Sequence, residues 1–253
     1  MRMESIKIRE ATAADAAIIA QAVAMAIGEE SIVKYCGAEY LKALEEAAAV
    51  PDTQYSYMNA LIAEVDGVAA GAVVGYDGAK LAPLRERTLS IVRKYNKDLK
   101  VIDEETQAGE FYIDSLAVLP QFRGNGLGEH LLKAIVQMAF AMGHECVGLM
   151  VDNTDNPGVA SFYARYGFQP VGEKRFFGHQ MQHLQCSQSS AIQKIQYTGL
   201  NYPQVQQFCG DQILAPYICM GFSMLSLLTP DGFVTVNEGD TICKDLTGKM
   251  WVE

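Results

Sequence analysis

The segment between residues 111 and 142 combines residue types that could bind a phosphate group. Phe111–Val118 has the composition of a strand, and a helical pattern follows from Gly126 to Met142. The turn between them is rich in glycine and reads Arg123-Gly124-Asn125-Gly126-Leu127-Gly128. The first N–H groups of a helix lack partners and lie at the positive end of its dipole, and glycine lets the backbone approach a ligand closely. We therefore expect this helix start to bind an anion such as a diphosphate.

This turn differs from two common nucleotide-binding motifs. Gly124, Gly126 and Gly128 match the beginning of the dinucleotide fingerprint, but that motif needs an acidic residue about twenty residues later, at the end of a second strand. Here the corresponding position falls inside the predicted helix. The Walker loop does not fit because no Gly-Lys-Ser/Thr follows the turn.

The motifs around the turn resemble the GNAT superfamily of acyl-CoA-dependent N-acyltransferases. Leu-Ala-Val-x-Pro precedes the Arg-x-x-Gly-x-Gly turn, and three landmarks follow it in the family's order: a strand over Cys146–Val151, a helix after Asn156-Pro157, and Tyr166-Gly167-Phe168. The resemblance covers roughly Ile6 to Gln185. It implies the α/β (α+β) GNAT fold, a mixed central β-sheet flanked by helices, and acetyl-CoA (CoA) as the cofactor.

The resemblance also implies roles for individual residues. The backbone of Leu116, Ala117 and Val118 would bind the pantetheine arm and the thioester oxygen. The pyrophosphate would lie on the turn, which consists of Arg123, Gly124, Asn125, Gly126, Leu127 and Gly128. Tyr163 takes the position of the acid that protonates the departing thiolate, and Asn156 takes a pantetheine-binding position. Two alternatives stay open: Tyr163 could belong to an aromatic stripe with Phe162 and Tyr166, and Asn156 could only cap its helix.

Transfer of an acetyl group to an amine needs a base, because an ammonium group must lose a proton before it attacks. Asp114 is the first candidate, since it shares a strand face with Tyr112 and burial would raise the pKa of a carboxyl group there. Glu110, at the strand entrance, is the second. Glu29 and Glu30 are the third, in an expected loop after the first helix. Surface pairing of Asp114, and a water chain without a single base, remain alternatives.

The chain has 253 residues and a net charge of −10, which argues against nucleic acid as a partner. This charge fits either attraction of a cationic amine or plain solubility. No apolar run reaches the roughly eighteen residues of a membrane span, and the N-terminus lacks the apolar core of a signal peptide. The six cysteines form no Cys-x-x-Cys pair, so we expect reduced thiols and a cytoplasmic protein.

The histidines do not suggest a metal site. His179 and His183 are four residues apart on a predicted strand around 178–184, where that spacing separates them by about 13 Å. We therefore expect no metal.

The elements before residue 77 follow the GNAT order of strand, helices and hairpin. Ile6–Glu10 alternates like a strand, and Thr12 with Asp15 forms a capping-box-like pattern that opens a helix to about Gly28. A second helix spans about residues 38–49. Two strands over 60–65 and 68–76 flank Asp66-Gly67, a strong hairpin signal.

Between residues 77 and 109 the chain is longer than a minimal GNAT member. Leu81–Tyr95 predicts a polar, basic amphipathic helix that includes Arg85, and Lys97–Gln107 predicts an irregular segment. Long insertions in compact domains are usually functional or flexible. We expect a flap or wall of the acceptor site, with a solvated helix as the alternative.

A polar linker over 185–190 is expected to separate a GNAT domain at 1–185 from a small β-rich domain at 191–253. The sequence of the second domain predicts strands over 191–197, 222–228, 233–236 and 250–252 and around Ile242. It also predicts a short helix that Asn201 can cap. It resembles a small phage-associated domain of unknown function in Ile195–Gly199, Phe208–Gly210 and Glu238–Lys244. The roles open to it are homodimer contact, substrate wall and partner recognition.

These observations predict an acetyl-CoA-dependent N-acetyltransferase that acts by direct attack of a primary amine in a ternary complex. The acceptor stays open between small-molecule amines and protein amines, and we expect no nucleic-acid or membrane partner. The alternative is a non-catalytic acyl-CoA-binding or scaffold protein that acts through residues 191–253.

Overall fold

The computed structural model describes residues 5–99, 104–152, 157–176, 179–219 and 222–253. The chain divides into two compact units, Met1–Ser187 and Gln188–Glu253. Gln185, Cys186 and Ser187, which we expected in a linker, instead complete strand β7 (His179–Ser187) of the first unit. They pair with β5, and the burial of Cys186 fixes them there.

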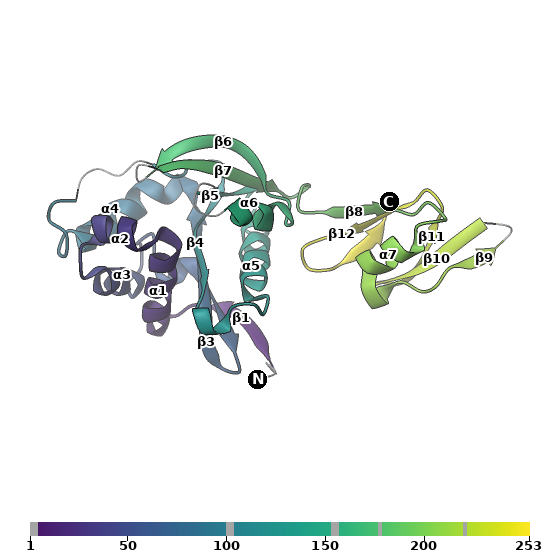
Figure 1. Ribbon diagram of the computed structural model, residues 1–253, viewed down its shortest axis with the longest axis horizontal. Helices are drawn as coiled ribbons and strands as arrows, with labels where there is room; N and C mark the ends of the chain where they lie inside the picture. The colour runs from purple at the N-terminus through teal and green to yellow at the C-terminus, as the bar shows by residue number, and fades with distance from the viewer. Residues whose placement is uncertain (1–4, 100–103, 153–156, 177–178, 220–221) are drawn as a thin grey trace. The chain divides into compact units, whose positions relative to one another are not determined.

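The first unit is built on a seven-stranded sheet in the order β1-β2-β3-β4-β5-β7-β6 (Figure 1). Besides β7 its strands are β1 (Ile6–Glu10), β2 (Ala60–Val65), β3 (Val68–Asp77), β4 (Phe111–Val118), β5 (Cys146–Val151) and β6 (Gln169–Phe176). Neighbouring strands are antiparallel, except that β4 and β5 are parallel. The mixed, helix-flanked sheet confirms the predicted fold class.

Helices cover both faces of this sheet. On one side lie α1 (Ala16–Ile27), α2 (Glu29–Cys36), α3 (Tyr40–Ala48) and α4 (Leu81–Val92), and on the other side lies α5 (Leu127–Ala141); α6 (Pro157–Ala164) follows β5 (Figure 1). The main core joins α1, α3 and the buried faces of β2 and β3, with Ile19, Leu44 and Ile62 fully buried.

The N-terminal predictions are confirmed in most details. The Thr12 N–H donates to the Asp15 carboxylate at 2.8 Å, as a capping box requires. Asp66 and Gly67 have φ angles of 51° and 80°, which is the left-handed geometry of the predicted hairpin turn. The prediction that Glu29 and Glu30 lie in a loop was wrong, because these residues open helix α2. Gly28 and Gly37, both with positive φ, separate this short helix from its neighbours.

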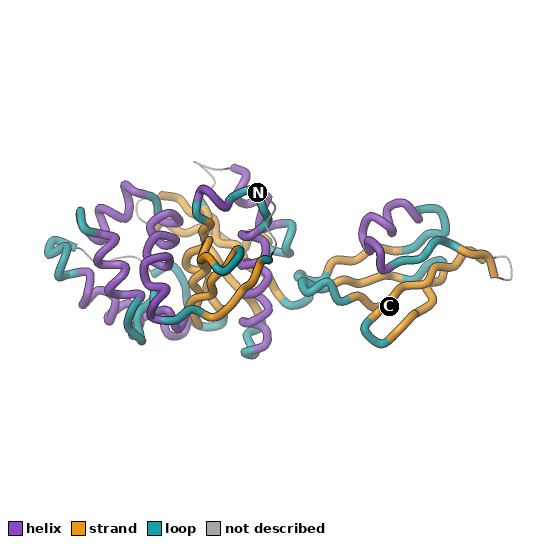
Figure 2. Tube along the Cα trace, turned by 90° about the horizontal axis from the view of Figure 1, so that it is seen from below, coloured by secondary structure: helices purple, strands orange, loops and turns teal. Residues whose placement is uncertain are grey.

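The second unit contains two three-stranded sheets, β11-β10-β9 and β13-β12-β8. Its elements are β8 (Gln193–Gln196), α7 (Tyr202–Cys209), β9 (Tyr217–Cys219), β10 (Phe222–Thr229), β11 (Gly232–Asn237), β12 (Thr241–Lys244) and β13 (Met250–Val252). Helix α7 lies against these strands (Figure 2). A core that includes Tyr197, Leu225 and Val236, all fully buried, gives this unit its own hydrophobic centre.

Two smaller predictions about the second unit can be compared directly with the structure. The hairpin of β10 and β11 around residues 229–232 is confirmed. Asn201 precedes α7 as expected, but its side chain accepts from the Thr198 N–H and donates to the Gln196 carbonyl, so it orders the preceding turn instead of capping the helix.

No single helix in the described part of the chain is long and apolar enough to cross a membrane. Residues 13–27 and 29–36 reach the required length and composition only when counted together, across a bend of 115°.

Candidate active site

The parallel strands β4 and β5 separate after their first two paired positions. They are paired only at Phe111–Val147 and Tyr112–Gly148, and beyond Tyr112 no further pair joins them among the described residues. Two parallel strands that separate in this way leave backbone N–H and C=O groups without partners in the sheet. The edge of β4 that β5 leaves open beyond Tyr112, called the cleft side below, is therefore a place where an extended ligand can hydrogen-bond to the backbone.

The hydrogen bonds to β3 show which groups of β4 face this cleft. The Leu119 N–H donates to the Ala70 carbonyl at 2.8 Å, so Leu119 faces β3. Because the bonding direction alternates along an antiparallel strand, Ala117 also faces β3, while Leu116 and Val118 face the side from which β5 has withdrawn. Of the three residues predicted to bind the pantetheine arm, the structure therefore places Leu116 and Val118 with their backbone groups towards the cleft.

The glycine-rich turn has the geometry expected of an anion site. Gly124 and Gly126 have φ angles of 81° and 77°, and Gly126 precedes the first residue of α5. No side chain among the described residues caps this helix start. Leu127 is buried and anchors the helix, whereas Gly124, Asn125 and Gly126 are exposed. The first N–H groups of α5 are thus available to an external acceptor.

Arg123 and Gly128 connect this turn to β4. The Arg123 Nε donates to the Val118 carbonyl at 3.0 Å, so its exposed guanidinium lies beside the end of the strand. A Cβ atom at Gly128 would meet the Leu116 side chain at 3.8 Å, an ordinary contact. The predicted phosphate-binding turn and the predicted pantetheine-binding strand are therefore in direct contact.

Tyr163 lies on α6 within a group of aromatic rings. Its ring centroid is 5.1 Å from that of Phe162 and 5.6 Å from that of Phe168, so the expected aromatic packing is present. Burial raises the pKa of Tyr163 to about 12, which keeps its hydroxyl group protonated at neutral pH. It can thus act as a donor whether or not it also packs the helix. Asn156 lies outside the described residues.

Asp114 occupies a β-bulge in β4. Ser115 is opposite Val74 and Ile113 is opposite Gly75, so no residue of β3 lies opposite Asp114 in the register. One extra residue reverses the alternation of side chains beyond it. Asp114 therefore lies on the same side of the sheet as Ala117, which packs in the core of α1 and α3, whereas Leu116 contacts the start of α5.

Asp114 is half-buried, and each oxygen of its carboxylate has a hydrogen-bond donor. It accepts hydrogen bonds from the Ser115 hydroxyl at 2.8 Å and from the Tyr76 hydroxyl at 3.0 Å. Burial raises the pKa of Asp114 above the ordinary aspartate range, although these hydrogen bonds and the nearby Arg85 guanidinium act in the opposite direction. A carboxylate with a raised pKa is suited to accept a proton near neutral pH.

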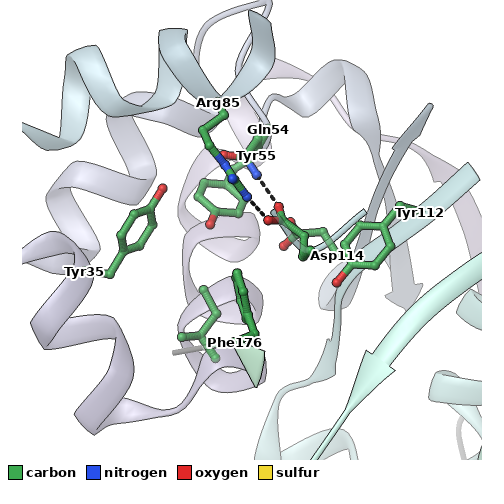
Figure 3. A pocket seen from close by; sticks show the side chains of 9 residues that line it. Tyr35, Gln54, Tyr55, Arg85, Tyr112, Asp114 and Phe176 are labelled. Atoms are coloured by element: carbon green, nitrogen blue, oxygen red, sulfur yellow. Dashed lines mark hydrogen bonds and ion pairs between the residues drawn. The ribbon is translucent and has the colours of Figure 1, made fainter. Parts of the chain in front are cut away.

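Asp114 opens onto a small cavity of about 40 Å³ (Figure 3). The lining residues come from seven separate segments: Ile27, Tyr35, Gln54, Tyr55, Arg85, Glu105, Tyr112, Asp114 and Phe176. Figure 3 shows Tyr35 and Tyr112 on opposite sides, with Arg85 and Gln54 reaching towards the carboxylates between them. The cavity is therefore polar at its centre and aromatic at its walls.

The insertion between β3 and β4 supplies two of these groups. Arg85 of α4 forms an ion pair with Glu105, and both side chains are nearly buried. We expected the insertion to form a flap or wall of the acceptor site, with a solvated helix as the alternative, and Arg85 lies in the wall of this cavity. The sequence held a signal for this: Arg85 falls in the buried stripe of α4 with Leu81, Thr88 and Leu89 at helical spacing.

Gln54, Tyr35 and Tyr55 were missed by sequence reasoning. Gln54 and Tyr55 lie in an irregular segment after α3, and Tyr35 lies on the unexpected helix α2. No motif marks such positions, because loops that line acceptor sites vary most in sequence.

Glu110 lies immediately before β4 and outside the cavity that Asp114 lines. It is 1% exposed and accepts hydrogen bonds from Thr106 at 2.6 Å, Gln185 at 2.7 Å and His183 at 2.9 Å. Burial acts to raise the pKa of Glu110, but the hydrogen bonds from His183, Thr106 and Gln185 outweigh it and hold the pKa below the usual value. Its carboxylate is thus engaged where β4, β5 and β7 meet, and it does not line the cavity.

The remaining carboxylate candidates lie apart from Asp114. Glu30 forms an exposed ion pair with Lys34. Glu29 lines a wider groove of about 460 Å³ with the ends of α1 and α3 and residues Leu119, Pro120 and Gln121. Within the described residues, no cluster of three or more potential metal ligands occurs.

Comparison with known proteins gives this geometry a family. The sequence profile of the acetyltransferase (GNAT) family matches residues 30–168. The solved structure described as "The crystal structure of acetyltransferase" is 33% identical to this chain, with a TM-score of 0.62 over 72% of this chain and 98% of the other. The structure of an N-acetyltransferase from Staphylococcus aureus Mu50 shares the fold at 24% identity and a TM-score of 0.61, over 71% and 99% of the two chains. No curated protein matches. The chain belongs to the acetyltransferase (GNAT) family.

Proposed function

We propose that this protein transfers an acetyl group from acetyl-CoA to a primary amine by direct attack in a ternary complex. Membership of the GNAT family supports acyl transfer from an acyl-CoA. The observation that carries the finer proposal is the geometry of β4. The bulge directs the Asp114 carboxylate into a cavity on one side, while Leu116, two residues later, directs its backbone towards the cleft beside β5. One strand thus presents a proton acceptor and a hydrogen-bond donor close together.

The chain offers groups suited to two parts of the cofactor, the pyrophosphate and the pantetheine arm. The free N–H groups at the start of α5 and the exposed Arg123 suit the pyrophosphate. The edge of β4 at Leu116 and Val118, which has no strand partner on the β5 side apart from the Arg123 bond to the Val118 carbonyl, suits the pantetheine arm. When bound there, acetyl-CoA supplies the thioester that the amine attacks.

The residues then divide the proton transfers among them. Asp114 accepts a proton from the ammonium group, which leaves a neutral nitrogen able to attack. The Leu116 N–H donates a hydrogen bond to the thioester oxygen as negative charge develops there. A C–N bond forms and the C–S bond breaks. Tyr163 donates a proton to the sulfur and recovers the second proton lost by the nitrogen, so one proton passes to solvent through Asp114.

The proposal is tested by the release of CoA. Purified protein is mixed with acetyl-CoA and a panel of primary amines, thiol release is followed with a chromogenic disulfide, and the acetylated amine is identified by mass spectrometry. We expect amine-dependent release together with the acetylated product. Tight binding of acetyl-CoA without turnover on any amine would show instead a protein that only binds the cofactor.

A further inference from the structure

The cavity beside Asp114 contains a buried acceptor that lacks a donor. Gln54 is 2% exposed, and its Nε2 donates to Glu105 at 2.8 Å and to the Tyr76 hydroxyl at 3.1 Å. Because a carboxylate only accepts, this bond fixes the nitrogen towards Glu105 and leaves the Gln54 Oε1 on the other side. That oxygen is buried and has no hydrogen-bond partner among the described residues. Such a group is costly unless a ligand satisfies it.

A second shortage of donors lies next to it. The Tyr76 hydroxyl is 3.0 Å from an oxygen of Glu105 and 3.0 Å from an oxygen of Asp114. A phenol has one proton, so it can donate to only one of the two carboxylates at a time. Arg85 compensates Glu105 as its ion-pair partner. Asp114 has one donor on each oxygen, from Ser115 and from this shared Tyr76 hydroxyl, and a carboxylate can accept more than two hydrogen bonds. It therefore has capacity for a further donor in the cavity that Gln54 also lines.

The charges of the lining residues point to a cation. Among the described residues that line the cavity, Asp114 and Glu105 are acidic and Arg85 is basic. With both carboxylates ionised, one negative charge is uncompensated. Three tyrosines, Tyr35, Tyr55 and Tyr112, add aromatic surfaces that also favour a cation. A primary ammonium group has three N–H donors and one positive charge, which matches this shortage.

The size of the cavity restricts what carries the ammonium group. A volume of about 40 Å³ holds an ammonium group and little more. Ile27 and Phe176 are the apolar, partly exposed members of the lining, so the rest of the acceptor would pass between an aliphatic and an aromatic side chain. A volume this small leaves little room for a ring or a branch next to the nitrogen.

We propose that the acceptor is a primary amine at the end of an unbranched aliphatic chain, whose ammonium group binds between the Gln54 oxygen and the Asp114 carboxylate. This inference rests on the proposed function and names the class of substrate for it. It excludes amino sugars and amines on branched or cyclic carbons as good acceptors.

The first test varies the substrate and leaves the protein unchanged. The value of kcat/KM is measured with acetyl-CoA and n-butylamine, 2-aminobutane, cyclohexylamine and glucosamine. We expect n-butylamine to exceed each of the other three by about tenfold or more, since overfilling a packed site carries a free-energy cost of that order. Equal or better values for glucosamine or cyclohexylamine would overturn the inference and leave the proposed function standing. Absence of transfer to every amine would overturn the proposed function, and the inference with it.

The second test removes the acceptor oxygen. Gln54→Met keeps the length of the side chain but has no amide oxygen, so KM for n-butylamine should rise about tenfold or more, with KM for acetyl-CoA unchanged. Gln206→Met makes the same change at an exposed position of α7 and serves as the control. An unchanged KM for the amine in a folded Gln54→Met protein would overturn the inference. If Gln54→Met does not fold, the comparison of the four amines decides the matter alone.

Discussion

Replacing Gly148 by alanine should disrupt the junction at which β4 and β5 separate. Gly148 is opposite Tyr112 in the last paired position of β4 and β5. A Cβ atom at this position would lie 2.0 Å from the Glu110 Oε2 and 3.0 Å from the His183 Nε2. Real Cβ atoms do not approach other atoms so closely, so the carboxylate of Glu110 would have to move by more than an ångström.

The cost follows from what that movement breaks. The Glu110 carboxylate holds three hydrogen bonds in a site that is 1% exposed. Separating a buried charge from its partners costs about 3–5 kcal/mol, against a total unfolding free energy of about 5–15 kcal/mol. We expect Gly148→Ala to lose about 3 kcal/mol and to melt roughly 10 °C lower.

The assay is thermal and urea unfolding of both proteins, with Gly172→Ala as the matched control. Gly172 also lies in a strand, but a Cβ atom there meets nothing within 4 Å. The control should be neutral or slightly stabilising. Adding Glu110→Asp to Gly148→Ala withdraws the carboxylate by one methylene group and should restore part of the loss. A stability within 1 kcal/mol of the parent for Gly148→Ala would refute the reasoning.

The loss of stability caused by Gly148→Ala should become smaller at acidic pH. The pKa of Glu110 is lowered in the folded protein. Its stabilising contribution is therefore complete above the pKa of the unfolded chain and is lost as the pH falls through the lowered folded value. The stability difference between Gly148→Ala and the parent should shrink over that acidic range.

Four other perturbations test the remaining parts of the site. Asp114→Asn should lower kcat/KM about a hundredfold or more and remove the acidic limb of its pH profile, which in the parent falls as the pH drops through the raised pKa of Asp114; an unchanged profile would exclude Asp114 as the base. Tyr163→Phe should lower kcat about tenfold or more with little change in the Kd of acetyl-CoA, and an unaltered kcat would remove its acid role. Gly126→Asp should weaken acetyl-CoA binding about tenfold or more by calorimetry, whereas Gly143→Asp, at the positive-φ glycine after the other end of α5, should not; equal effects would show that strain alone is responsible. Removing residues 188–253 should leave transfer to small amines unchanged, because the first unit has its own core, and loss of that activity would contradict this independence.

The parts of the fold that carry a local signal could be predicted from the sequence. The residue types of the Asp66-Gly67 turn are enough to predict its left-handed backbone geometry. The same is true of the glycines before α5. Strand β6 had no such signal. Gln169–Phe176 is an edge strand with most of its residues exposed, so it lacks the apolar alternation from which strands are recognised. Helix α2 is only eight residues long, and its opening Glu29-Glu30 resembles a polar loop.

The positions proposed to act through backbone groups could be proposed from the sequence. The set of side chains that lines the cavity could not. The positions on β4 and the turn that we propose for the cofactor lie within one continuous segment. The cavity draws instead on seven separated segments, and only tertiary packing brings Gln54 and Glu105 to Asp114. Glu110 shows the same limit: its place at the strand entrance was foreseen, but its three donors come from positions 4, 73 and 75 residues away.

The bulge at Asp114 makes the length of β4 as consequential as its composition. Residues before it and after it are out of phase by one position, so Asp114 and Ala117 can share a side of the sheet although an odd number of steps separates them. A deletion of one residue here would restore regular alternation and send either the carboxylate or the cleft-facing backbone to the wrong side. This strand should therefore tolerate exchanges of residue type far better than any insertion or deletion, and a designer who grafts the site onto another sheet must transplant the irregularity along with the residues.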